Sequence, residues 1–182
     1  MKVFGVVGLP ASGKGEFSKI AAARGIPVIV MGDMIRNAVQ MAGLEPTDAN
    51  LGAMATNLRA KQGMDAIAQL CVPEIQRQTA PIILIDGIRG DAEVTLFRRV
   101  FPGFLLIRID SSFETRLARI QARGRSDDFS SAGELRTRDE RELSWGLGNA
   151  LNEADVHISN EGTLAEFGAA VQSFFESREH EQ

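Results

Sequence analysis

The stretch Gly8-Leu-Pro-Ala-Ser-Gly13-Lys14, which directly follows the apolar run at residues 3–7, decides the fold. It fits the pattern G-x-x-x-x-G-K, in which the glycines let successive backbone N–H groups point at phosphate oxygens. A helix that opens at Lys14 would add the positive end of its dipole, and the lysine would reach the β- and γ-phosphates. We therefore predict a loop that binds a triphosphate through Gly8, Pro10, Ala11, Ser12, Gly13, Lys14, Gly15 and Glu16.

A magnesium ion that accompanies the triphosphate needs ligands of its own, and the sequence offers few. Phosphate loops usually carry a serine or threonine directly after the lysine, but this chain has Gly15. We expect the ion to be held mostly through water, by Ser12 at a distance or by residues elsewhere. Asp86 follows the apolar run 82–85, as a Walker B aspartate does. An aspartate that merely ends a strand in a turn is the alternative, and we favour Asp86 as the metal-site residue, acting through water.

The chain as a whole excludes several classes of protein. Its 182 residues suffice for a single domain, residues 1–182, with a sizeable core. A net charge of −4 argues against a general nucleic-acid-binding surface. No apolar stretch approaches the roughly 18 residues that span a bilayer, and we see no signal peptide. The single cysteine, Cys71, has apolar neighbours and is expected in the core. We expect a cytoplasmic protein without a membrane partner, in an oligomeric state that the sequence leaves open.

Strand-like and helix-like patterns alternate along the chain. Buried strands are predicted over residues 3–7, 27–31, 81–87, 104–110 and 155–159. The alternation is typical of an α/β fold, here a three-layer α/β/α sandwich of the P-loop type with a five-stranded parallel sheet. Helices at about 33–78 would form the acceptor side, and a short helical lid would span about 112–145.

Arginines supply most of the positive charge, and several follow predicted strand ends. Arg36 follows the second strand and Arg89 the third, so both are candidates for gripping an acceptor. Seven arginines lie between positions 116 and 141, where they could close over a transferring phosphoryl group. Arg123 and Arg125, beside a polar loop, are the best catalytic candidates. The alternative is a solvated helix face whose arginines pair with neighbouring carboxylates, and we expect some of them to do so.

Asp33 has two interpretations that the sequence does not separate. A hydroxyl acceptor benefits from a carboxylate that takes its proton, and Asp33 is placed for that role. Equally, it could be the N-cap of a helix that begins at Met34. A monophosphate acceptor is already an anionic nucleophile and would need no base.

Three motifs carry a resemblance to a known family. Residues 8–15, 32–36 and 86–89 resemble the phosphate loop, the acceptor-site arginine and the Walker B and acceptor-arginine segment of adenylate kinases and related nucleoside monophosphate kinases. Residues 154–166 are similar to dephospho-coenzyme A kinases, which implies that Asn160 and Gly162 lie beside the donor adenine. The combination is most similar to an uncharacterised archaeal family described as adenylate-kinase-related. The resemblance implies ATP as donor, with Mg²⁺.

Three hypotheses follow. The first is an ATP-dependent kinase that transfers the γ-phosphate to a nucleoside monophosphate, with Lys14 acting on the donor. The second is a kinase that phosphorylates a hydroxyl, as in dephospho-coenzyme A, with Asp33 as base. The third is an ATP-hydrolysing regulator that works through a protein or RNA partner. Its motivation is Glu16, which stands where adenylate kinases carry a threonine, together with an acceptor region, residues 44–78, that matches no known adenosine monophosphate pocket.

Overall fold

The computed structural model describes residues 1–123 and 131–179. Its helices and strands are β1 (Lys2–Val7), α1 (Lys14–Ala23), β2 (Val28–Val30), α2 (Met31–Met41), α3 (Asp48–Gln62), α4 (Ala66–Gln76), β3 (Ile82–Ile88), α5 (Asp91–Val100), β4 (Leu105–Asp110), α6 (Phe113–Arg123), α7 (Ala132–Leu143), α8 (Leu147–Asn152), β5 (Val156–Ser159) and α9 (Leu164–Glu179). Among these described helices, none is long and apolar enough to span a membrane.

The five strands form one parallel sheet in the order β2-β3-β1-β4-β5. β1 lies in the centre, where Phe4 pairs with Leu84 of β3 on one side and with Leu105 of β4 on the other. Every strand is joined to the next through at least one helix, as parallel pairing requires. The predicted α/β fold with a five-stranded parallel sheet is confirmed.

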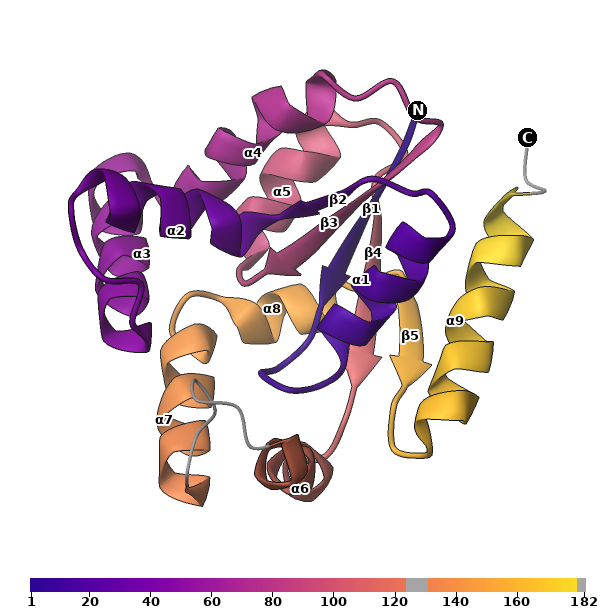
Figure 1. The fold of residues 1–182 in the computed structure, drawn as a ribbon. Helices are drawn as coiled ribbons and strands as arrows, with labels where there is room; N and C mark the ends of the chain where they lie inside the picture. Colours follow the sequence, from indigo (N-terminus) through magenta and orange to yellow (C-terminus); the bar gives the residue numbers. More distant parts are fainter. Residues whose placement is uncertain (124–130, 180–182) are drawn as a thin grey trace.

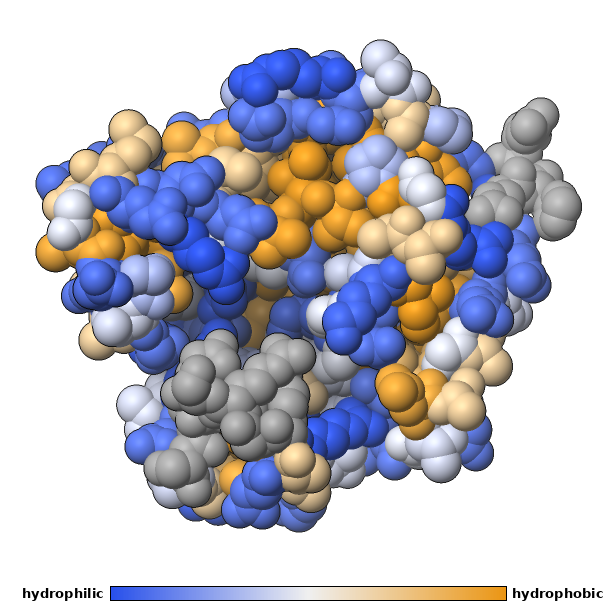
Figure 2. Space-filling view, viewed as in Figure 1, coloured by the Kyte–Doolittle hydropathy of each residue, from blue (hydrophilic) through white to orange (hydrophobic). Residues whose placement is uncertain are grey.

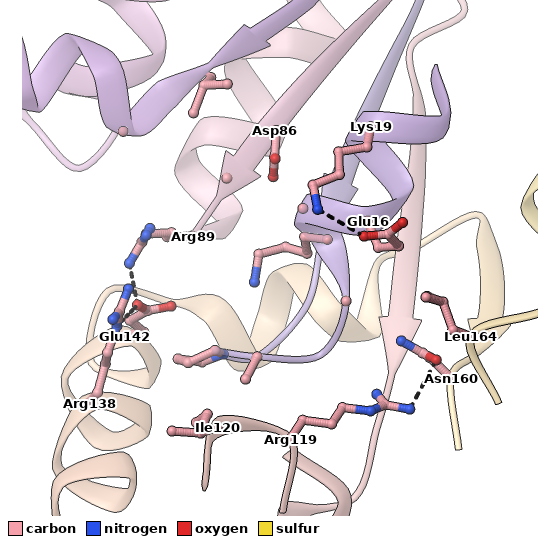
Figure 3. Close-up of a pocket in the computed structure, with 18 of the residues that line it drawn as sticks. Glu16, Lys19, Asp86, Arg89, Arg119, Ile120, Arg138, Glu142, Asn160 and Leu164 are labelled. Atoms are coloured by element: carbon pink, nitrogen blue, oxygen red, sulfur yellow. Dashed lines mark hydrogen bonds and ion pairs between the residues drawn. The ribbon is translucent and has the colours of Figure 1, made fainter. Parts of the chain in front are cut away.

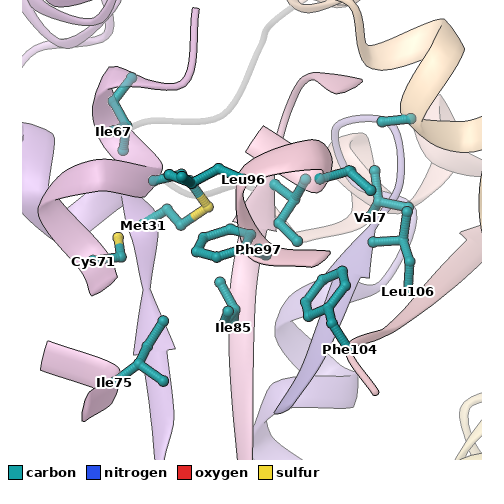
Figure 4. Close-up of a cluster of buried hydrophobic side chains, with 14 of the residues drawn as sticks. Val7, Met31, Ile67, Cys71, Ile75, Ile85, Leu96, Phe97, Phe104 and Leu106 are labelled. Carbon is teal, nitrogen blue, oxygen red and sulfur yellow. The ribbon is translucent and has the colours of Figure 1, made fainter. Parts of the chain in front are cut away.

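Helices cover both faces of the sheet and give the fold its three layers. Side chains alternate along β1, so Phe4 and Val6 face one side while Val3 and Val7 face the other. On the first side they pack against α1 and α9, in a cluster rich in phenylalanine. On the second side α2, α4, α5 and α8 supply the partners, with Phe97 and Ile85 near the middle (Figure 4). Because the central strand is buried on both faces, it reads as a continuous apolar run.

The carboxyl ends of the strands carry the loops that matter for function. The phosphate loop leaves β1 at this edge of the sheet, and α6 and α7 lie beyond it (Figure 1). Ser112 caps α6, since its hydroxyl accepts a hydrogen bond from the N–H of Thr115 at 3.2 Å. α7 begins with a capping box between Ser131 and Glu134. The lid prediction thus corresponds to two helices, and the polar loop at 124–130 between them falls outside the described residues.

Two local expectations were wrong. The second strand ends at Val30, and α2 begins at Met31 with no intervening loop. Asp33 therefore lies within the first turn of α2 and is not its N-cap, a position that Val30 occupies. The short helix α8 was not expected, because its six residues carry no periodic apolar pattern. It forms because Leu147 and an alanine one turn later are buried against the core, after a turn at Gly146 with φ of 91°.

Candidate active site

The phosphate loop connects β1 to α1 through two residues in the left-handed region. Gly13 has φ of 113°, and Ala11, which carries a side chain, has φ of 61°. Such a conformation costs a non-glycine residue about 1 kcal/mol or more and is concentrated at functional loops. A Cβ on Gly13 would lie 2.2 Å from the side-chain nitrogen of Asn160. Position 13 therefore requires glycine both for its positive φ and for lack of space. The loop is therefore held in a shape that packing, rather than local preference, maintains.

Lys14, the first residue of α1, bridges the loop that it follows. Its ammonium group donates hydrogen bonds to the carbonyl oxygens of Gly8 at 2.6 Å and Leu9 at 3.0 Å. Burial lowers the pKa of Lys14 from 10.5 to about 8, and the negative charge of Glu142 partly counteracts it. The positive charge of Arg89 lowers the pKa further. A lysine in this state gains from any anion that reaches it.

A cavity of about 570 Å³ opens over this loop. Figure 2 shows the surface hollowed near the centre of one face, with hydrophilic residues bordering the hollow. Among the described residues that line it, six are basic and three are acidic, so the cavity favours a ligand with several negative charges. Of the predicted phosphate-loop residues, Gly8 and Ser12 do not line the cavity. Those that do are Pro10, Ala11, Gly13, Lys14, Gly15 and Glu16.

A buried carboxylate, Glu142 of α7, anchors one end of this cavity (Figure 3). It is 2% exposed and accepts hydrogen bonds from the guanidinium groups of Arg89 and Arg138, the latter at 3.1 Å. Burial alone would raise the pKa of Glu142, but the charges of Arg89, Lys14 and Arg138 outweigh burial and hold the pKa below its usual value. Glu142 is therefore ionised and neutralises cations that come from three different elements.

Behind Arg89 lies a second buried carboxylate, Glu93 of α5. It accepts a hydrogen bond from the backbone N–H of Arg89 at 2.7 Å and forms an ion pair with Arg59 of α3 at 2.8 Å. The Arg59 guanidinium also stacks 4.3 Å from the centre of the Trp145 ring. Burial raises the pKa of Glu93, and Arg59 partly offsets this. Glu93 thus fixes the backbone that follows β3 and so directs Arg89 toward the cavity.

Asp48 joins helices α3 and α7 beside Arg138, which lines the cavity. Its carboxylate accepts two hydrogen bonds from Arg141, both at 3.1 Å, and lies 3.7 Å from Arg138. Gly52, one turn along α3, allows this approach, because a Cβ there would lie 3.0 Å from the Arg141 guanidinium. Asp48, Arg138, Glu142 and Arg89 therefore form a row of alternating charges that runs from α3 through α7 to the end of β3.

Two lid arginines serve the architecture of the loop. Arg116 of α6 is 2% exposed, makes a bidentate ion pair with Asp139 of α7 at 2.9 and 2.7 Å, and donates to the carbonyl of Pro10 at 3.1 Å. It therefore ties both lid helices to the phosphate loop. Arg119 lines the cavity and donates to the side-chain oxygen of Asn160 at 3.1 Å. Arg116 pairs with a carboxylate, as the alternative for these arginines expected, but it does so in a buried position between two helices and not on a solvated helix face.

The predicted adenine-side residues lie at the other end of the cavity. Asn160 and Gly162 both line it, close to Arg119 and the exposed Leu164 (Figure 3). The Asn160 amide is already used, because its nitrogen donates to the carbonyl of Ser12 at 2.9 Å while its oxygen accepts from Arg119. Asn160 thus supports the phosphate loop from the end of the cavity where the sequence predicted the adenine.

The remaining predicted residues are placed as follows. Arg36 lines the cavity beside Gly32, and its guanidinium pairs with Asp33 at 2.6 Å on the exposed side of α2. Asp33 does not line the cavity. The Arg123 side chain and the whole of Arg125 lie outside the described residues. Cys71 is buried in the core, as expected, and burial raises its pKa to about 12, which makes it inert.

The residues that sequence reasoning missed are Glu142 and its partner Arg138. A signal was present, since Leu135, Asp139 and Glu142 recur at spacings of four and three and so share one face of α7. All three are buried. Acidic residues on the apolar side of a helix require buried cationic partners. That pattern could have identified Glu142.

The residues at the end of β3 fit a magnesium ion only in part. Asp86 lines the cavity, and one of its oxygens accepts a hydrogen bond from the Ser18 hydroxyl at 2.7 Å. Within residues 1–123 and 131–179, no group of three or more metal-ligating side chains occurs. Ser12 is buried away from the cavity, so it offers no ligand. Asp86 could hold a hydrated Mg²⁺ whose other ligands come from water and nucleotide phosphates, the arrangement that Mg²⁺ prefers.

Solved structures share this fold at low sequence identity. A protein from Thermus thermophilus, TT1252, matches with a TM-score of 0.63 and 15% identity, over 96% of both chains. A gluconokinase from Sinorhizobium meliloti 1021 matches with a TM-score of 0.54 and 18% identity, over 97% of this chain and 94% of that one. A shikimate kinase from Aquifex aeolicus vf5 matches with a TM-score of 0.54 and 15% identity, over the whole of both chains. The fold is therefore that of P-loop kinases.

Sequence comparison identifies much closer relatives. A family model described as an AAA domain matches residues 5–142. A UPF0200 protein from Methanoregula boonei is 65% identical over the full length of both chains. Another from Methanoculleus marisnigri is 60% identical, over 95% of this chain and 94% of that one. On this similarity, the chain belongs to the UPF0200 family.

Proposed function

We propose that the protein transfers the γ-phosphate of ATP to a nucleoside monophosphate. The observation that carries the proposal is the buried cluster around Glu142. Lys14 comes from the phosphate loop, Arg89 from the end of β3 and Arg138 from the lid, yet all three cations act on this one carboxylate. Phosphoryl transfer asks for such convergence, because catalysis is mainly positioning and neutralisation of charge.

In this proposal the donor lies along the phosphate loop. The N-terminus of α1 and Lys14 neutralise the β- and γ-phosphates, and the adenine lies toward Arg119 and Leu164. Asp86 holds Mg²⁺ through water, and the ion would neutralise further phosphate charge when bound. The acceptor phosphate is gripped by Arg89, Arg138 and Arg36, which border the opposite part of the cavity. Arg123 and Arg125 remain candidates for closing over the transferring group.

An acceptor that is already an anion suits these surroundings. Arginines are the side chains that bind phosphate with two parallel hydrogen bonds. Asp33, the base that a hydroxyl acceptor would need, spends one oxygen on Arg36 at 2.6 Å and is about half exposed. Asp33 is also absent from the lining of the cavity in which an acceptor would bind. The transfer to a hydroxyl therefore gains no support from Asp33.

The test is phosphate transfer from ATP in magnesium to nucleoside monophosphates, nucleosides and dephospho-coenzyme A, each beside ATP alone. We expect saturable transfer to a monophosphate. Arg89→Ala should reduce kcat/KM for the acceptor by roughly 10- to 100-fold, the value of a charge-assisted hydrogen bond, and leave ATP affinity within about threefold. Arg77→Ala is the matched control, since Arg77 is exposed at the C-cap of α4, outside the cavity.

Each alternative outcome points elsewhere. Transfer only to nucleosides or dephospho-coenzyme A would contradict the proposal and restore a role for a base, which Asp33→Asn would test. Slow ATP hydrolysis without any acceptor would favour a regulator that acts through a partner.

A further inference from the structure

Ser18 of α1 contacts Asp86, and the proposed function assigns this contact no role. Ser18 lies one helical turn after Lys14 and is 8% exposed. A buried serine in a helix ordinarily bonds the carbonyl one turn before it. Here the hydroxyl donates instead to the Oδ2 atom of Asp86 at 2.7 Å, across 68 positions of sequence. This bond ties the end of β3 to the first turns of α1 and fixes the orientation of the carboxylate.

Open space lies beside Gly15, the next residue of the phosphate loop. Gly15 follows Lys14, where phosphate loops usually carry the hydroxyl that binds magnesium directly. Its φ is outside the left-handed region, and a Cβ built on it would meet no atom within 4 Å. Neither backbone conformation nor crowding therefore requires glycine there, and glycine costs a helix about 1 kcal/mol relative to alanine. The missing side chain leaves open volume at the edge of the cavity, beside the phosphate loop.

We infer that Ser18 is the positioning residue for Asp86 and that the open volume over Gly15 is space for a hydrated magnesium ion. The inference rests on the proposed function, because the ion arrives with ATP. Ser18 occupies one oxygen of Asp86 and leaves the other to accept hydrogen bonds from metal-bound water. The protein thereby binds Mg²⁺ through its hydration shell, and Gly15 offers the ion no hydroxyl ligand.

The test compares binding of a non-hydrolysable ATP analogue in magnesium and in EDTA, by calorimetry. The ratio of the two affinities measures magnesium coupling without any turnover. Ser18→Ala should reduce this ratio about tenfold, as loss of an outer partner of a metal ligand does, and leave the affinity in EDTA unchanged. Ser177→Ala, in α9, is the matched control, because its hydroxyl bonds the Phe174 carbonyl away from the site. A ratio unchanged in Ser18→Ala overturns the positioning role.

Gly15→Ser provides a second and independent measurement that does not depend on a core substitution. The new hydroxyl fits the open volume and should raise the magnesium ratio about tenfold, both alone and in the Ser18→Ala background. An unchanged ratio in Gly15→Ser overturns the inference that the ion lies there. If the unaltered protein binds the analogue neither in magnesium nor in EDTA, the proposed function fails. Binding that is equal in both conditions refutes the magnesium inference alone.

Discussion

Glu142→Gln should destabilise the protein, because it removes the charge that three cations share. Glutamine keeps the shape of the side chain but removes the negative charge that Arg89 and Arg138 share, and Arg138 then keeps Asp48 at 3.7 Å. A hydrogen bond between charged groups contributes about 1.5–3 kcal/mol, and both arginines are about one-quarter exposed, at 25% and 26%, so solvent screens part of this. We expect the free energy of unfolding to fall by about 2 kcal/mol. For a chain of this size, that lowers the Tm by roughly 4 to 8 °C.

The pH dependence of the stability lost in Glu142→Gln tests the role of Glu142 more sharply than the size of the loss. The pKa of Glu142 lies below its usual 4.5 in the folded protein, so its contribution is fully present above pH 4.5. It declines as the pH falls through the folded-state pKa. Denaturant unfolding of both proteins between pH 3 and pH 8 should therefore show a difference that is constant above about pH 4.5 and shrinks below it.

Glu140→Gln is the matched control, since Glu140 lies on the same helix but is exposed. It should change the stability by less than about 0.5 kcal/mol at any pH. Inorganic phosphate should also raise the Tm of Glu142→Gln more than that of the unaltered protein, because the Glu142 carboxylate no longer competes with the anion for Arg89 and Arg138. Equal stability of the two proteins, or an equal response to phosphate, would refute the assigned role of Glu142.

Three further perturbations test other parts of the site. Lys14→Met should abolish ATP binding. It should also raise the free energy of unfolding at pH 7 by about 2 kcal/mol, because the folded protein must keep a charge on a buried lysine whose pKa is about 8. The stability difference between Lys14→Met and the unaltered protein should shrink as the pH rises from about 8 to 10.5, where the buried lysine is neutral. For the same reason, titration calorimetry of the unaltered protein should show ATP affinity falling above about pH 8. Asp48→Asn should lower stability by at most about 1 kcal/mol, as for an exposed pair, but should increase hydrogen exchange at the start of α3. Arg116→Ala should lower stability by roughly 3 kcal/mol, because it strands the nearly buried Asp139, and thermal unfolding with and without ATP should show that nucleotide protection is lost as well.

The parts of the fold that the sequence predicted are those set by neighbouring residues. The run into Gly8 and Lys14 defines its strand, loop and helix locally, and the apolar strands follow from their own composition. The start of α2 was misjudged because Val30 passes directly into a helix, with no polar cap to mark the boundary. Local rules are weakest where two elements join without a loop.

The charge network of the site could not be predicted in the same way. Glu142 meets Arg89 across 53 positions, and Asp48 meets Arg141 across 93. Such pairs depend on how α3, α5 and α7 pack around the sheet, and any of the many arginines could have been the partner. Helical spacing shows which face an acidic residue occupies, but it does not show what lies opposite that face.

The hydrogen bond from Asn160 to the carbonyl of Ser12 has a consequence for how the molecule is made. A ribosome synthesises the phosphate loop almost first, but the residue that braces it follows 148 positions later. Gly13, Arg119 and Ser111 meet the same short segment around Asn160. A nascent chain should therefore bind nucleotide only after β5 has joined the sheet. Nucleotide added during synthesis would then bind only complete chains and not incomplete ones. Nucleotide binding would therefore show that folding is complete.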